Sequence, residues 1–201
     1  MGLTHVFQRE LTWLEEVIKL RIVFPEADPV HFDLEIFLSE FPNRNKIATE
    51  IKDRFNTSPP LLDAEENYVY SEIIKKCEFE ERLLLILALS IHLEPGFINR
   101  ILEQYHYSEV IKKTSGFWSI SGILADERFG ILPTGRFWIY LLAGTDLNRR
   151  IALLSKLGKG SIHLITSGLV DIAASEETEP CYGGFLKIDQ SVLNSLFSDI
   201  D

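Results

Sequence analysis

The sequence predicts an α+β fold that is predominantly helical, and three observations lead to this prediction. Residues 83–93 are apolar at all but two positions, so they predict a helix that is buried on every face. Residues 130–150 fit a short strand, a Pro-Thr-Gly turn and two successive helices. Residues 161–174 and 185–188 are β-like and predict a C-terminal segment rich in strands.

The N-terminal region, residues 1–78, predicts helices separated by proline-containing segments. Residues 3–24 predict an amphipathic helix that ends at a proline. The residues that recur at three- or four-residue spacing along it are Phe7, Leu11, Leu14, Ile18 and Arg21. Residues 32–38 alternate between apolar and polar, which fits a strand, and a short helix fits them as well. Further helices are expected over residues 45–57 and 63–76.

The central region, residues 79–157, predicts three helices, a β-hairpin and two more helices. The buried helix comes first, and we expect Leu85, Leu89 and Phe97 in this region to be nearly inaccessible to solvent. The expected helices span residues 80–93, 95–105, 108–113, 135–143 and 147–157. The hairpin pairs residues 120–124 with 129–132, and a last helix runs from Asp189 or Ser191 to Phe197.

Three short stretches, at residues 82–93, 131–135 and 141–147, occur in the order of a known domain. They resemble R-L-x-L-A-L-A-P-H-L, F-L-P-T-G and L-L-A-G-D-D-L in the winged-helix domain that precedes the ATPase module in a group of bacterial AAA-type ATPases. Arg136 departs from this pattern, because the family usually has an acidic residue there. The resemblance implies a winged helix over residues 79–157, with the segment 158–201 resembling the family more loosely.

No motif in the sequence indicates catalysis, a cofactor or a metal. The phosphate-binding pattern G-x-x-x-x-G-K-[ST] is absent, and Gly158-Lys159-Gly160 follows a helix and predicts its end. The histidines are scattered, and two cysteines 104 positions apart predict buried thiols rather than a metal site. We therefore expect no catalytic, cofactor-binding or metal-binding residues in this chain, and no binding of ATP.

The formal net charge of −10 disfavours nucleic acid as a partner, because phosphates are bound chiefly through Lys and Arg. Five cations form the candidate interaction surface. Lys112 and Lys113 lie where a winged helix would place its recognition helix, and Arg128 would lie at the wing tip. Arg149 and Arg150 are expected on the exposed face of their helix. In so acidic a chain, such residues more often form a solvated face.

The function that the resemblance implies is that of a non-catalytic N-terminal recognition, adaptor or regulatory domain of an AAA-type ATPase. Such a domain would bind a protein partner or pack on the ATPase module in cis. The alternative is a DNA-binding winged-helix regulator. The sequence has no secretory signal and no apolar segment long enough to cross a membrane, which predicts a cytoplasmic protein without a membrane partner.

Overall fold

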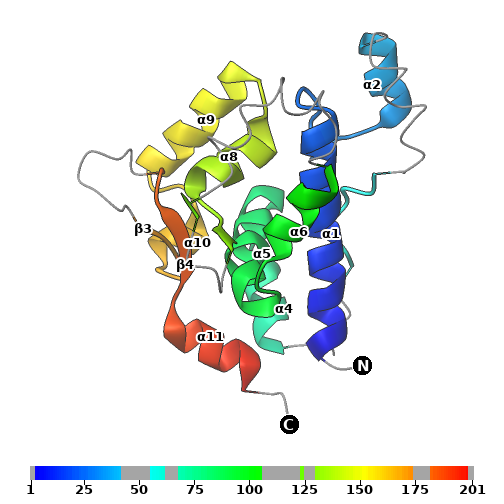
Figure 1. Ribbon diagram of the computed structural model, residues 1–201. Coiled ribbons are helices and arrows are strands. Elements are labelled where there is room, and N and C mark those ends of the chain that lie inside the picture. Colours follow the sequence, from blue (N-terminus) through cyan, green and yellow to red (C-terminus); the bar gives the residue numbers. More distant parts are fainter. Residues whose placement is uncertain are drawn as a thin grey trace.

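The computed structural model describes residues 3–41, 55–61, 68–105, 123–124, 130–173 and 182–198. Their helices are α1 (Leu3–Val23), α2 (Leu34–Glu40), α4 (Tyr68–Ile74), α5 (Phe79–Leu93), α6 (Phe97–Tyr105), α8 (Gly135–Ala143), α9 (Leu147–Gly158), α10 (His163–Thr166) and α11 (Gln190–Phe197) (Figure 1). The strands are β1 (Ile123–Leu124), β2 (Ile131–Leu132), β3 (Val170–Ala173) and β4 (Phe185–Ile188). The α+β, predominantly helical fold class is confirmed.

Helix α5 lies at the centre of the core, where it contacts α1, α8, α10 and β4. Every residue from Leu83 to Ser90 is buried. Leu85 and Leu89 are fully inaccessible and Phe97 is 2% exposed, which confirms the predicted core positions. The hydroxyl of Ser90 donates to the carbonyl of Leu87 at 2.7 Å, so this buried polar group is satisfied within its own helix.

One hydrophobic cluster extends from Val6 on α1 to Leu196 on α11. It therefore includes residues from all three predicted regions, 1–78, 79–157 and 158–201. A smaller aromatic cluster joins the end of α1 to α2, with the rings of Phe24 and Phe37 4.9 Å apart. The larger cluster packs the other elements around α5, and the smaller one holds α2 against the end of α1.

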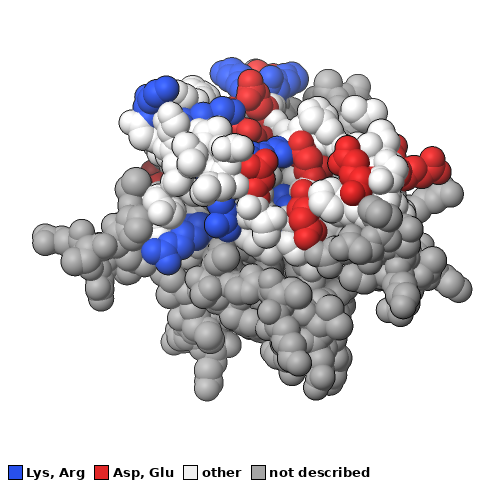
Figure 2. Space-filling model, turned by 90° about the horizontal axis from the view of Figure 1, so that it is seen from above, with Lys and Arg blue, Asp and Glu red and all other residues white. Residues whose placement is uncertain are grey.

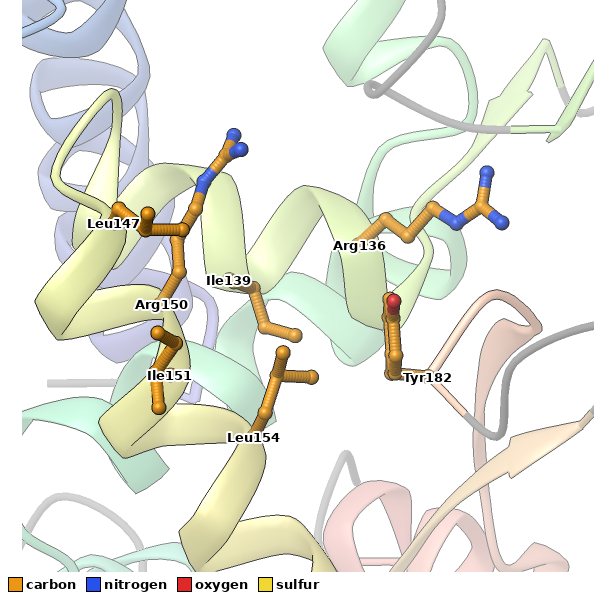
Figure 3. A pocket seen from close by; sticks show the side chains of 7 residues that line it. All are labelled: Arg136, Ile139, Leu147, Arg150, Ile151, Leu154 and Tyr182. Atoms are coloured by element: carbon orange, nitrogen blue, oxygen red, sulfur yellow. The ribbon is translucent and has the colours of Figure 1, made fainter.

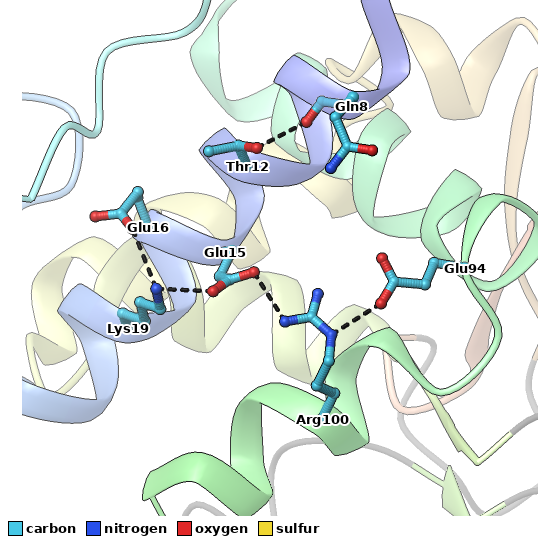
Figure 4. Close-up of polar contacts among 7 residues, drawn as sticks. All are labelled: Gln8, Thr12, Glu15, Glu16, Lys19, Glu94 and Arg100. Carbon is cyan, nitrogen blue, oxygen red and sulfur yellow. Dashed lines mark hydrogen bonds and ion pairs between the residues drawn. The ribbon is translucent and has the colours of Figure 1, made fainter. Parts of the chain in front are cut away.

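Ion pairs at the surface join α1 to the start of α6 (Figure 4). Arg100 lies 3.1 Å from the carboxylate of Glu15 and 2.8 Å from that of Glu94. One turn further along α1, Lys19 lies 2.7 Å from Glu15 and 3.3 Å from Glu16. Partly exposed pairs of this kind contribute at most about 1 kcal/mol each.

The described strands form two antiparallel sheets of two strands each. The predicted hairpin is confirmed in its pairing, because Ile123 lies opposite Leu132, while the rest of the predicted hairpin is largely outside the described residues. The second sheet pairs β3 with β4, with Val170 opposite Ile188. The predicted helix over residues 108–113 and most of the one over residues 45–57 also lie outside the described residues.

Two segments show where local pattern was insufficient. Residues 32–38, which fitted both a strand and a helix, include the start of α2, whose first turn is capped by Asp33 through the Ile36 amide at 3.0 Å. The β-like prediction for residues 161–174 was wrong at α10. The carboxylate of Glu81, on α5, accepts the backbone N–H of His163 at 2.5 Å, so a distant residue stabilises that helical turn.

In the described part of the chain no single helix is long and apolar enough to cross a membrane. Helices α5 and α6 reach that length and apolar character only when they are taken together, and they are bent by 97° relative to each other.

Candidate functional site

The Pro-Thr-Gly turn joins the start of α8 to the segment before β4. The hydroxyl of Thr134 accepts a hydrogen bond from the Phe137 amide at 3.1 Å and so caps α8. The amide of Gly135 donates to the carbonyl of Gly184 at 3.1 Å. A Cβ at Gly135 would lie 2.5 Å from the carbonyl oxygen of Tyr182, so only glycine fits here. This turn therefore holds Tyr182 beside α8.

The Leu-Leu-Ala-Gly-Thr-Asp stretch forms the junction of α1, α8 and α9. Arg21, which is 1% exposed, donates to the carbonyl of Leu141 from Nε at 3.1 Å and from Nη2 at 2.8 Å. Its Nη1 donates to the carbonyl of Pro25 at 2.5 Å. Gly144, with φ +50°, packs against this guanidinium, and Asp146 then caps α9 through two backbone amides. These residues hold α9 at a fixed place beside α8.

The guanidinium of Arg21 lies against the C-terminal end of α8, where helix carbonyls carry partial negative charge. Burial lowers the pKa of Arg21 to about 10, which still leaves the side chain charged at neutral pH. Tyr140 packs over it with 5.9 Å between the guanidinium carbon and the ring centroid. The arginine on the predicted apolar stripe of α1 is thus a buried link between helices.

A second buried ionisable cluster joins α1 to α5. Glu10 is fully inaccessible and forms an ion pair with Arg82. Arg82 also donates to the carbonyl of Pro60 at 2.6 Å and lies over the ring of Trp13 at 5.6 Å. Burial raises the pKa of Glu10 above its ordinary value, although Arg82 acts in the opposite direction. The buried carboxylate thus links α1 to α5 through Arg82.

The burial of Glu10 leads to a prediction about pH. The folded protein binds a proton at Glu10 more tightly than the unfolded chain does, because the folded pKa is raised. The contribution of this group to stability is therefore full below about pH 4.5 and is lost as the pH rises through the folded pKa. Glutamine does not titrate. Urea titrations measure the free energy of unfolding of the unmodified chain and of Glu10→Gln at each pH. The first value minus the second should fall as the pH rises to about 7.

Glu15 provides the matched control of opposite sign. Burial acts to raise the pKa of Glu15, but hydrogen bonds from Lys19 and Arg100 outweigh it and the pKa is lowered. Its contribution to stability is therefore present above its ordinary pKa and is lost as the pH falls through the folded pKa. The free energy of unfolding of the unmodified chain minus that of Glu15→Gln should therefore rise with pH. Differences that change in the same direction for both variants would contradict the prediction.

A groove lies between α8 and α9 (Figure 3). Its volume is about 310 Å³, and its lining consists of Arg136, Ile139, Leu147, Arg150, Ile151, Leu154 and Tyr182. Ile139, Ile151 and Leu154 gather in its middle, and both guanidinium groups lie toward one side (Figure 3). Leu147 is 66% exposed and Ile151 is 56% exposed, and the two lie together in one groove, so they form a patch rather than single exposed residues. The groove thus offers an exposed apolar surface with two cations beside it.

The charge of this groove is opposite to that of the chain. Its lining contains two arginines and no acidic residue, whereas the chain has a net charge of −10. Among the described residues, Arg136 has no ion pair, and the buried Nε of Arg150 has no hydrogen-bond partner. From above, Lys and Arg side chains lie mainly on the side of α8 and α9, and Asp and Glu extend toward α2 (Figure 2). The groove can therefore attract an acidic, amphipathic ligand.

The structure brings one of the five candidate interaction residues to this groove. Lys112, Lys113 and Arg128 lie outside the described residues. Arg149 forms an ion pair with Asp28, and Arg150 lines the groove. The expectation that these two arginines lie on the exposed face of their helix was wrong. Both are half-buried, because this face of α9 packs toward the loop after α1 and toward α8.

Most of the groove residues were not predicted from the sequence, although part of the pattern that forms the groove is visible in it. Leu147, Ile151 and Leu154 are spaced as one stripe of a helix, which ordinarily indicates a core face. Arg136 was noticeable only as a departure from the resembled pattern. Tyr182 comes from a distant segment, and no local pattern connects it to α8.

Other chemically reactive groups in the described residues form no site. No three His, Cys, Asp or Glu side chains in the described ranges are arranged to hold a metal ion. Cys77 is half-buried and its thiol donates to the carbonyl of Ile73 at 3.3 Å. Burial raises the pKa of this thiol to about 11, which keeps it protonated and unreactive at neutral pH.

Comparison of the chain with protein-family models, with curated proteins and with solved structures gave no match.

Proposed function

We propose that this chain is a non-catalytic recognition or adaptor domain that binds a protein partner in the α8–α9 groove. The observation that carries this proposal is the exposed apolar surface of Leu147 and Ile151 beside two arginines. Exposed apolar patches with polar rims are typical of protein-binding surfaces. An amphipathic helix could bury its apolar face in such a groove and place its acidic residues near the guanidinium groups.

The resemblance to the winged-helix domain suggests that this domain functions together with an AAA-type ATPase module. The proposed location of both is the cytoplasm. The order α5, α6, β1, β2 and α8 is compatible with that domain. The resembled motifs have structural roles in this chain: the Pro-Thr-Gly turn starts α8, and the Ala-Gly-Thr-Asp stretch sets the junction to α9. These roles are compatible with a shared architecture, and the last residue of the third stretch, Leu147, also lines the groove.

The DNA-binding alternative has less support. Its three cations, Lys112, Lys113 and Arg128, lie outside the described residues, and Arg149 is already neutralised by Asp28. A protein that binds duplex DNA would also have to overcome the electrostatic repulsion between the phosphates and a chain of net charge −10.

Affinity purification from the source organism tests the proposal. The tagged chain should recover a P-loop ATPase, identified by mass spectrometry, because the groove would hold its partner. Ile151→Glu should abolish this recovery by placing a carboxylate in the apolar groove. Ser155→Glu is the matched control, because Ser155 is exposed on the same helix and does not line the groove. This variant should recover the ATPase as well as the unmodified chain does.

Two results would contradict the proposal. One is recovery of the same proteins by the unmodified chain and by both variants. The other is tight binding of duplex DNA that weakens steeply with salt and is lost when Lys112, Lys113 and Arg128 are replaced with alanine. The second result would establish the DNA-binding regulator instead.

A further inference from the structure

Helix α2 presents an acidic, apolar surface to solvent. Its inner side is anchored by Phe37, which is buried in the aromatic cluster at the end of α1. Its outer side consists of Glu35, Ile36, Ser39 and Glu40, all exposed. Ile36 is 61% exposed, so α2 displays a large apolar side chain with a carboxylate on either side. In the described residues neither glutamate is paired with a cation.

This surface is complementary to the α8–α9 groove in both polarity and charge. An isoleucine beside two acids would face Leu147 and Ile151 beside two arginines. Three of the four large apolar side chains that the described residues expose strongly belong to these two surfaces. Burying them together would remove apolar surface from water on both sides.

The two surfaces cannot meet within one molecule. Figure 1 shows α2 at one upper corner and α9 at the other, with α1 and α6 between them. The aromatic cluster holds the inner side of α2 against the end of α1. A contact between α2 and the groove therefore requires two molecules.

We infer that the groove accepts α2 from a second copy of this chain, so that the copies associate head to tail. This inference rests on the proposed function: it names a second copy of this domain, joined to the ATPase module that the resemblance implies, as the protein that the same groove binds. The two contributing surfaces differ, so the interface is heterologous, and successive copies form a ring or an open chain. Both surfaces are small, so the isolated domains should associate with a Kd on the order of 0.1–1 mM.

Sedimentation velocity over about 0.02 to 1 mM covers the range expected for such an interface. The sedimentation coefficient of the unmodified chain should increase with concentration, and higher salt should reduce the increase because charges contribute. Ile36→Glu and Ile151→Glu should each remain monomeric. Ser155→Glu should behave like the unmodified chain. Both isoleucines are exposed, and circular dichroism should confirm that the variants are folded.

Mixing the two monomeric variants gives the decisive measurement. The Ile36→Glu chain retains an intact groove, and the Ile151→Glu chain retains an intact α2. An equimolar mixture should therefore form a dimer with one copy of each chain and nothing larger, because the other two surfaces are blocked. A symmetric contact of α9 with α9, or of α2 with α2, would not be restored in this way.

Each remaining outcome overturns the inference. Self-association that persists in the single variants would place the interface elsewhere. A mixture that stays monomeric would exclude the head-to-tail contact. A chain that is monomeric at every concentration, while Ile151→Glu still abolishes recovery of the ATPase, would overturn the inference and leave the proposed function standing. Failure of both experiments would reject both proposals.

Discussion

Replacing Gly144 with alanine should lower the free energy of unfolding by about 4 kcal/mol, from backbone strain and steric overlap together. The residue has φ +50° and ψ −118°, a conformation that L-amino acids strongly avoid. A Cβ there would lie 2.0 Å from the carbonyl oxygen of Pro25 and 2.1 Å from Nη1 of Arg21. Both neighbours are fixed, because that carbonyl accepts the Arg21 hydrogen bond. Urea denaturation followed by circular dichroism measures the loss.

Gly158→Ala is the matched control for this substitution. Gly158 is the last residue of α9, and a Cβ there would meet no atom within 4 Å. Alanine favours a helix over glycine by up to about 1 kcal/mol, so this variant should be as stable as the unmodified chain or slightly more stable. Equal losses in the two variants would mean that Gly144 has no special role at the junction of α1, α8 and α9.

Replacing Leu85 with alanine should cost about 2–5 kcal/mol, because lost burial and a residual cavity both destabilise the core. Leu85 is completely inaccessible in the middle of α5. Since α5 contacts α1, α8, α10 and β4, relaxation around the cavity would require several elements to move. Thermal and urea unfolding should both shift. A loss of this size would be a large share of a typical stability of about 5–15 kcal/mol.

Leu61→Ala tests the same chemical change without burial. Leu61 is 91% exposed, so its truncation should change the free energy of unfolding by less than about 0.5 kcal/mol. An unchanged unfolding curve for Leu85→Ala would contradict the central place of α5 in the core.

Local sequence patterns predicted the elements whose stabilising partners are close in the chain. The position of α5 followed from apolar residues on every face, because only the centre of a core can accommodate such a helix. The start of α9 followed from Asp146, and Asp189 was one of the two residues predicted to start α11. Each of these carboxylates accepts hydrogen bonds from amides two or three residues ahead. The end of α8 followed from Gly144, because a glycine is common after the last turn of a helix.

The same patterns failed where the deciding partner is far away. The turn of α10 depends on Glu81, which lies on α5 more than 80 positions earlier. Arg21 was recognisable as part of the stripe of α1, but its role required the carbonyl of Leu141 from another helix. These contacts depend on packing, and the periodicity of one segment contains no information about the segment that will cover it.

The candidate site shows this division most clearly. The sequence by itself contains an apolar stripe at Leu147, Ile151 and Leu154 in a predicted helix, and two acids near Ile36 in a segment that fitted both a strand and a helix. Only the tertiary structure decided that part of the stripe stays exposed, that Arg136 and Arg150 lie beside it and that Tyr182 borders it. The physical reason is that burial depends on what surrounds a side chain. Gly135 and Gly144 allow Tyr182, Pro25 and Arg21 to approach the two ends of α8 closely, and these contacts come from segments distant in the sequence.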